Sequence, residues 1–95
     1  MIGETILKQL GGNKFLITTG VNNLKQYKNS LLMTLPKNKS KANKLQIILI
    51  DYNLYTLKFF KETKTGIKEV NTFSGVYGNQ LTELFTQITG LYTTL

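Results

Sequence analysis

The sequence predicts an α+β fold: an antiparallel β-meander of four to five strands, with a short N-terminal helix and a C-terminal amphipathic helix packed on the sheet. Three observations support this prediction. Apolar and polar side chains alternate in several short segments of the chain. Short connections separate these segments, which favours antiparallel neighbours. Near the end of the chain, the apolar residues recur with a helical period instead.

The N-terminal helix is predicted over residues 3–10. Ile2, Ile6 and Leu10 fall on one face at intervals of four. The glycine pair that follows supplies a left-handed stop. Because two turns of helix are marginal alone, we expect this helix to dock onto another element.

The C-terminal helix is predicted from apolar residues that recur at intervals of three and four. Gly90 ends this helix, and Ser74 and Asn79 are alternative N-caps. Residues 91–95 form a tail that we expect to fold back onto the core. The apolar residues of the helix are Tyr77, Leu81, Leu84, Phe85 and Ile88.

Five segments are predicted as strands from their β-favouring composition and from the turn residues between them. Residues 20–29 are predicted as a polar connection. Residues 45–50, the most apolar segment, are predicted as a central strand with apolar side chains on both faces. Residues 67–73 are predicted as an edge strand with one polar side. The predicted strands are residues 14–19, 30–35, 45–50, 54–62 and 67–73.

All of the basic residues are lysines, and all of them lie in residues 1–69. Twelve lysines accompany four acidic residues there, whereas residues 70–95 carry one acid, Glu83; the net charge of the chain is +7. Such a basic body favours contact with a polyanion. The alternative interpretation is a solvated surface, because an AT-rich coding sequence also yields many Lys and Asn and no Arg.

The composition argues against several kinds of chemistry. The chain has no Cys and no His, which excludes disulfides, thiolate nucleophiles and histidine bases or ligands. Since the five acids are dispersed, we expect no enzymatic activity, no cofactor and no metal site. No apolar run approaches the roughly 20 residues of a membrane span, and residues 1–5 lack the pattern of a secretory signal. We expect one domain, residues 1–95, in the cytoplasm.

The clearest functional candidate is a lysine-rich loop after Pro36. Residues 37–44 carry four lysines and no acid, and a second lysine group surrounds the turn at 63–66. Lysine suits phosphate contact, whereas base reading mostly uses Arg, so we expect single- or double-stranded nucleic acid bound with little sequence specificity. Whether both groups share one end of the sheet stays open. The candidate nucleic-acid-binding residues are Lys37, Lys39, Lys41, Lys44, Lys58, Phe60, Lys61 and Lys64.

Stacking on unpaired bases requires accessible aromatic rings. Phe60 shares a predicted strand face with Lys58. If the C-terminal helix covers the other face, Phe60 and Lys58 lie on an open face; the arrangement we expect instead has one helix on each face and the rings in the core. Exposed rings at Phe60 and Tyr52 would favour nucleic acid. The aromatic residues interleaved with lysines are Tyr27, Tyr52, Tyr55, Phe59 and Phe60.

Certain local patterns carry a resemblance to a known group of proteins. The patterns are LGGNKF at 10–15, LY at 54–55, GVYGNQL at 75–81, LF at 84–85 and TGLYT at 89–93. Nearly end to end, the chain resembles small proteins of about this length that bacteriophages and mobile elements encode. The resemblance implies a phage-type origin and a setting in the host cytoplasm. It carries over no activity and no functional residues.

The sequence leaves two classes of function open. The first is a small non-catalytic accessory protein of phage type that binds nucleic acid. The second is a protein-interaction or assembly module that binds a host or phage protein, such as an acidic partner, through residues 75–95, which are low in charge and rich in apolar groups. The unpaired edges of a small sheet and the apolar tail also predict a homodimer.

Overall fold

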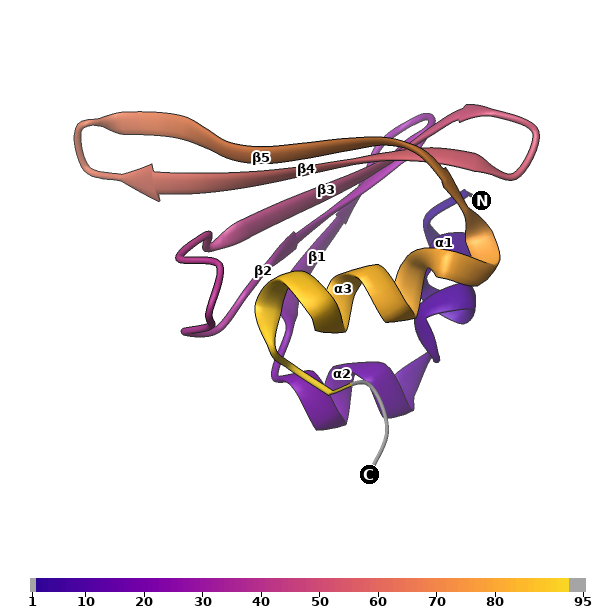
Figure 1. Ribbon diagram of the computed structural model, residues 1–95, viewed down its shortest axis with the longest axis horizontal. Helices are drawn as coiled ribbons and strands as arrows, with labels where there is room; N and C mark the ends of the chain where they lie inside the picture. The colour runs from indigo at the N-terminus through magenta and orange to yellow at the C-terminus, as the bar shows by residue number, and fades with distance from the viewer. Residues whose placement is uncertain (1, 93–95) are drawn as a thin grey trace.

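The computed structural model describes residues 2–92, which form a sheet of five strands and a layer of helices (Figure 1). The elements are α1 (Ile2–Leu10), α2 (Asn13–Thr19), β1 (Asn22–Gln26), β2 (Ser30–Thr34), β3 (Lys44–Asp51), β4 (Leu54–Thr63), β5 (Gly66–Tyr77), the 3-10 turn η1 (Gly78–Gln80) and α3 (Leu81–Thr89). The strands lie side by side in chain order, and each pair of neighbours is antiparallel. The predicted α+β meander is therefore confirmed.

The hydrophobic core lies on one face of the sheet. Helices α1, α2 and α3 all lie on the same side of the sheet, below it and to its right in Figure 1. Leu31, Ile47 and Leu57 are neighbours across β2, β3 and β4, and all three are buried on this face. The expectation that one helix covers each face is wrong for the described helices, since they pack together on the same side.

Residues 14–19 form helix α2 and not the predicted strand. Phe15 and Thr19, four residues apart, are buried, whereas Ile17 between them is 78% exposed. The Phe15 ring meets the Phe85 ring of α3 edge-on, with the ring centroids 5.0 Å apart. Composition favoured a strand here, but burial of one helical face against α3 outweighs that preference.

The first strand is β1, which lies within the predicted connection of residues 20–29. Leu24 is half-buried, and the four polar residues around it in β1 are exposed. An edge strand packs on the core through few side chains, so its composition resembles that of a loop. This explains why the sequence did not reveal it.

β3 is the central strand, as predicted, but its two faces differ. Leu45 and Ile47 are buried beneath the helices. Gln46 and Ile48, which alternate with them, are only half-buried, and Ile50 is exposed. The face away from the helices therefore carries accessible apolar side chains.

The C-terminal helix is shorter than predicted, because β5 continues to Tyr77. The turn η1 separates the two, and the Tyr77 amide donates to Oε1 of Gln80 at 3.0 Å. Neither Ser74 nor Asn79 caps α3, which begins after Gln80 without a side-chain cap. The other predicted elements, at 3–10, 30–35, 54–62 and 67–73, agree with α1, β2, β4 and β5 to within a few residues.

α2 and α3 end with the same local structure. Thr19 and Thr89 are buried, and each hydroxyl donates to the carbonyl of the phenylalanine four residues earlier, at 2.6 and 2.7 Å. The next residue, Gly20 or Gly90, adopts a φ of 77° in both helices, a conformation that favours glycine. The backbone amide of the residue after the glycine, Val21 or Leu91, donates to the threonine hydroxyl oxygen. Gly90 therefore ends α3 as predicted.

Both edge strands are irregular. The register of β1 against β2 shifts between Asn22 and Lys25. The register of β5 against β4 shifts twice, at residues 55–57 and 59–60 of β4. Such bulges bend an edge and interrupt its row of backbone donors and acceptors. They make each edge a poorer template for a second chain, and the homodimer stays a prediction.

The predicted C-terminal tail is described as far as Tyr92. Leu91 is half-buried and packs against the core, while Tyr92 is exposed. Residues 93–95, which were also predicted to fold back, lie outside the described residues.

Tyr55 connects the sheet to α1. Its ring is buried, and its hydroxyl donates to Oε1 of Gln9 at 2.7 Å. Nε2 of Gln9 in turn donates to Oδ1 of Asn53 at 3.1 Å. Burial raises the pKa of the Tyr55 hydroxyl above its ordinary value of 10.0, because the phenolate would lose its hydration.

We expect Phe85→Ala to lower the free energy of unfolding by about 3–5 kcal/mol, since a fully buried ring is replaced by a cavity. Leu84, which is only half-buried, is the matched control in the same turn. Its truncation to Ala should cost clearly less. Urea denaturation followed by circular dichroism measures both; equal losses would show that Phe85 is not part of the core.

Stability should decline as the pH rises above about 10, because the folded state holds the Tyr55 proton more tightly than the unfolded chain does. The contribution is fully present below the unfolded-state pKa of about 10 and is lost as the pH rises through the higher folded-state pKa. Tyr55→Phe should show a shallower decline between neutral pH and about pH 11. Urea titrations across this range test it, and parallel curves for the two proteins would contradict it.

Candidate nucleic-acid interface

The face of the sheet opposite the helices, here called the open face, carries lysines and aromatic rings at the end where β3 begins and β4 ends. Phe60 of β4 lies opposite Lys44 of β3, and Lys58 lies opposite Gln46 in the next row of the same face. A shallow hollow of about 310 Å³ crosses this region. Its lining residues are Lys25, Tyr27, Leu32, Lys44, Gln46, Phe60, Glu62 and Ile67.

Two aromatic rings are accessible in this hollow. Tyr27 is 50% exposed and Phe60 is half-buried. Phe60 shares its face with Lys58, as predicted. Tyr52 is 94% exposed, but it lies in the turn between β3 and β4, at the opposite end of the sheet. Phe60 and Tyr27 are therefore the rings that lie near lysines on the open face.

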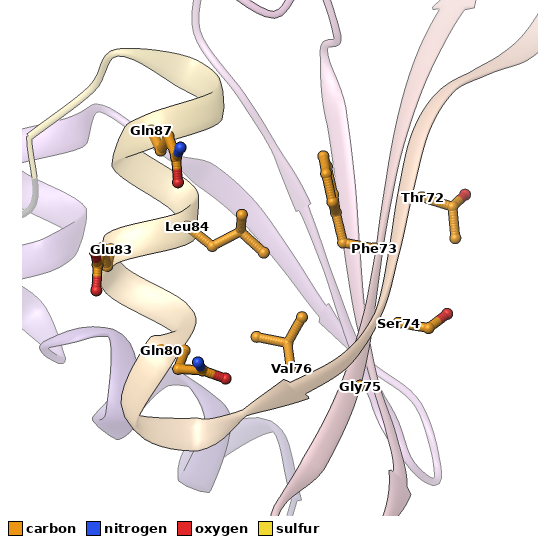
Figure 2. Close-up of a pocket in the computed structure, with 9 residues that line it drawn as sticks. All are labelled: Thr72, Phe73, Ser74, Gly75, Val76, Gln80, Glu83, Leu84 and Gln87. Carbon is orange, nitrogen blue, oxygen red and sulfur yellow. The ribbon is translucent and has the colours of Figure 1, made fainter.

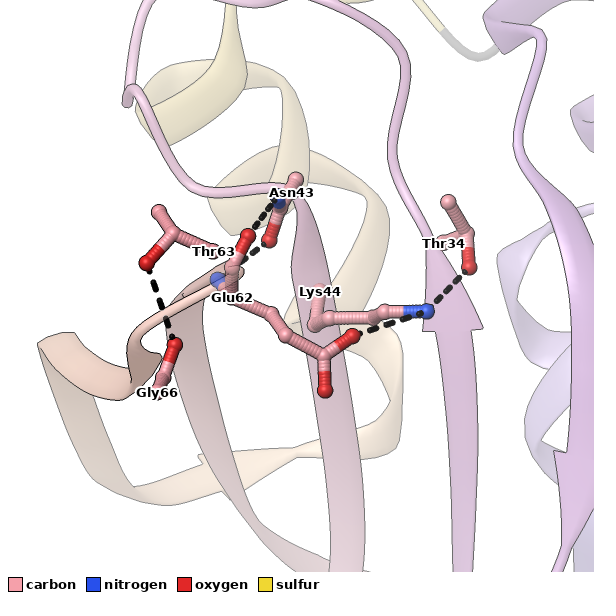
Figure 3. Close-up of polar contacts among 6 residues, drawn as sticks. All are labelled: Thr34, Asn43, Lys44, Glu62, Thr63 and Gly66. Atoms are coloured by element: carbon pink, nitrogen blue, oxygen red, sulfur yellow. Dashed lines mark hydrogen bonds and ion pairs between the residues drawn. The ribbon is translucent and has the colours of Figure 1, made fainter.

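Lys44 belongs to β3 and not to the loop in which it was predicted. Its Nζ donates to Oγ1 of Thr34 at 2.8 Å and lies 3.9 Å from Oε1 of Glu62 (Figure 3). The Glu62 side chain is 54% exposed, so water weakens this ion pair. Lys44 is held in place on the open face, but part of its charge is already matched.

The two lysine groups of the sequence lie at the same end of the sheet, and Asn43 holds them together. Nδ2 of Asn43 donates to the Glu62 carbonyl, and Oδ1 accepts from the Glu62 amide, both at 2.8 Å (Figure 3). The backbone N–H of Asn43 also donates to the Phe60 carbonyl at 2.9 Å. These bonds extend the pairing of β3 with β4 into the lysine-rich loop.

The lysines nevertheless divide between the two sides of the sheet. Lys44 and Lys58 lie on the open face, whereas Lys61 alternates to the helix side, where it lies opposite Lys68 of β5. A hollow of about 350 Å³ on that side, here called the loop hollow, joins Lys61 to the loop. Its lining residues are Leu35, Pro36, Lys37, Asn38, Lys41, Ala42, Asn43 and Lys61.

Lys39 and Lys64, the remaining predicted site residues, are both exposed. The Lys39 amide donates to the carbonyl of Thr89 at 2.9 Å, which docks the loop on the end of α3. Lys64 lies in the turn between β4 and β5. The structure therefore assembles the predicted lysines around one end of the sheet but not into one continuous patch.

A third hollow, of about 510 Å³, lies between β5 and α3. Figure 2 shows Leu84 of α3 pointing into this space toward Phe73 and Val76 of β5. Gln80, Gln87 and Glu83 line its helical side. This hollow belongs to residues 75–95 and their immediate neighbours, the region predicted as an alternative interaction surface.

Tyr27 and Lys25 were not among the predicted site residues. The segment that contains them was assigned to a connection, which left their orientation undefined. A usable signal was the spacing of Lys25 and Tyr27, two residues apart before the turn into β2, which places both on one face of a strand.

Comparisons with known proteins do not assign this chain to a family. No family model, no curated protein and no solved structure matches it. In the described part of the chain, no helix is long and apolar enough to cross a membrane, and no group of three or more acidic side chains is placed to hold a metal ion. The surface chemistry of the two lysine-bearing hollows therefore carries the functional argument.

We expect Asn43→Ala to lower the free energy of unfolding by about 1–2 kcal/mol, because both hydrogen bonds to the Glu62 backbone are lost. Asn71→Ala, at an exposed position of β5, is the control and should change stability by less than about 0.5 kcal/mol. Amide hydrogen exchange of residues 37–42 should also accelerate in Asn43→Ala alone. Unchanged exchange would mean that Asn43 does not fix the loop.

Proposed function

We propose that this protein is a small non-catalytic accessory protein that binds single-stranded nucleic acid on the open face. One observation carries the proposal: the described helices cover a single face of the sheet, and the uncovered face holds Tyr27 and Phe60 among Lys25, Lys44 and Lys58. A phage-type origin and a host-cytoplasm setting, both implied by the sequence resemblance, belong to this proposal.

Binding would use two kinds of contact. Unpaired bases stack on the faces of Tyr27 and Phe60, each worth about 1–3 kcal/mol. The ammonium groups of Lys25 and Lys58 neutralise phosphates between the stacked bases, which makes the affinity depend on salt. Because lysine is a point charge and the chain has no Arg, the contacts discriminate little between bases.

A single strand suits this face better than a duplex. Phe60 is half-buried within the sheet, so its ring can stack only with a base that is neither paired nor stacked between its neighbours in the strand. The bases of a duplex remain paired with one another, and a duplex would contact the lysines alone. We therefore expect tighter binding to oligothymidylate than to a duplex of equal charge.

The second candidate function is a protein-interaction module that uses the hollow between β5 and α3. The inward-pointing Phe73, Val76 and Leu84 favour it, since they offer apolar surface next to an edge strand (Figure 2). Leu84→Lys would block this hollow and leave the open face intact. Loss of a partner's binding in Leu84→Lys, with oligonucleotide binding unchanged, would assign that partner to this site.

Phe60→Ala should weaken binding to oligothymidylate by about 1–3 kcal/mol, the value of one stacked base. Tyr52→Ala removes a more exposed ring at the other end of the sheet and should leave the affinity unchanged. Fluorescence anisotropy at low salt measures both variants, with circular dichroism to confirm folding. Equal losses in the two variants would argue against stacking at Phe60.

The wild-type protein sets the wider test. If it ignores both single- and double-stranded oligonucleotides at low salt, the proposal fails and the lysines are a solvated surface of biased composition. Sedimentation at micromolar concentration, run on the same samples, decides whether the binding species is the predicted homodimer or a monomer.

A further inference from the structure

We infer that the loop hollow is a second nucleic-acid contact, which binds a phosphate backbone independently of the open face, so that one molecule of this protein holds two segments of strand. The inference rests on the proposed function for the first segment. It goes further because it assigns the lysines of the loop to a different strand from the one that stacks on Phe60.

The sheet itself separates the two contacts. Phe60 and Lys61 are consecutive residues of β4, so their side chains point to opposite sides of the sheet. Phe60 lines the hollow of the open face, and Lys61 lines the loop hollow. A straight segment bound to one hollow therefore does not reach the other.

The chemistry of the loop hollow favours phosphates and not bases. Three of its lining residues, Lys37, Lys41 and Lys61, are cationic, and within the described part of the chain none of its lining residues is acidic or aromatic. The acids near this end, Glu62 and Glu69, lie on the other side of the sheet, level with Phe60. Lysines without rings bind a backbone by charge and leave the bases free.

Lys61 and Lys68 lie directly opposite each other on neighbouring strands, on the helix side of the sheet. Like charges in this position repel and destabilise the strand pair. Lys37 and Lys41 add to the same positive field from the loop. An anion in the loop hollow would relieve this repulsion, so the repulsion favours anion binding by the folded protein.

The loop that carries Lys37 and Lys41 is held in a defined conformation by hydrogen bonds within it. Nδ2 of Asn38 donates to the carbonyls of Pro36 and Ala42 at 2.7 and 2.8 Å, and its Oδ1 accepts from the Ser40 amide at 2.9 Å. Lys41 adopts a φ of 71°, which is uncommon for a residue with a long side chain. These hydrogen bonds therefore fix the backbone that carries Lys37 and Lys41 beside the loop hollow before any ligand binds.

The test uses oligothymidylate of about eight nucleotides, which is short enough to occupy a single contact. One oligonucleotide is immobilised, the protein is added, and capture of a second, labelled oligonucleotide is measured. Native mass spectrometry counts oligonucleotides per chain. The test variant is Lys41→Gln with Lys61→Gln; the control variant of equal charge is Lys8→Gln with Lys14→Gln, at exposed positions on α1 and α2.

We expect two oligonucleotides per chain for the wild type and the control, and one for the test variant. Lys61→Gln alone, which removes one phosphate contact, should lower the slope of log affinity against log salt for the second oligonucleotide by about 0.7. Binding of the first oligonucleotide, and its sensitivity to Phe60→Ala, should remain.

Each contrary result has a distinct meaning. A wild type that binds one oligonucleotide per chain and captures no second one overturns this inference and leaves the proposed function standing. Capture that persists in the test variant also overturns it, because a dimer would then bridge two strands through two open faces. A wild type that binds no oligonucleotide overturns the proposed function and this inference together.

Discussion

The edge-on contact between Phe15 and Phe85 is the interaction on which the layer of helices depends. α2 has seven residues and α3 has nine, and helices of this length are marginal in water by themselves. The contact joins a helix near the start of the chain to one near its end, so they pack as one layer against one face of the sheet. The opposite face is left without a helix over it, and the Phe60 ring lines a hollow there.

Much of the architecture could be predicted from local sequence patterns, and α2 also has a signal in the sequence. The pattern F-x-x-x-T-G followed by an aliphatic residue occurs twice, at residues 15–21 and 85–91. The second copy predicts a helix with a glycine stop, as observed for α3, whereas the first copy predicts a strand where the structure has α2. Ile17, Thr18 and Thr19 are β-branched and suggested that strand, whereas the spacing of Phe15 and Thr19 carried the correct information.

The separation of Lys58 from Lys61 follows from the predicted strand, because residues three apart on a strand lie on opposite sides of the sheet. The grouping of lysines from different segments could not have been predicted from the sequence. Lys61 instead shares a hollow with Lys41, twenty positions away along the chain. Such proximity depends on the register between β3 and β4 and on the bonds that Asn43 makes, and neither follows from composition or periodicity.

The bulges of β1 and β5 affect how copies of this protein interact with one another at high local concentration. A chain that coats a polyanion meets other copies of itself at very high local density, where straight sheet edges would join into cross-β ribbons. The interrupted edges of this sheet offer no long regular stretch on which such a ribbon could nucleate. Under the proposed function, copies bound side by side along one strand would therefore have little tendency to join through their sheet edges.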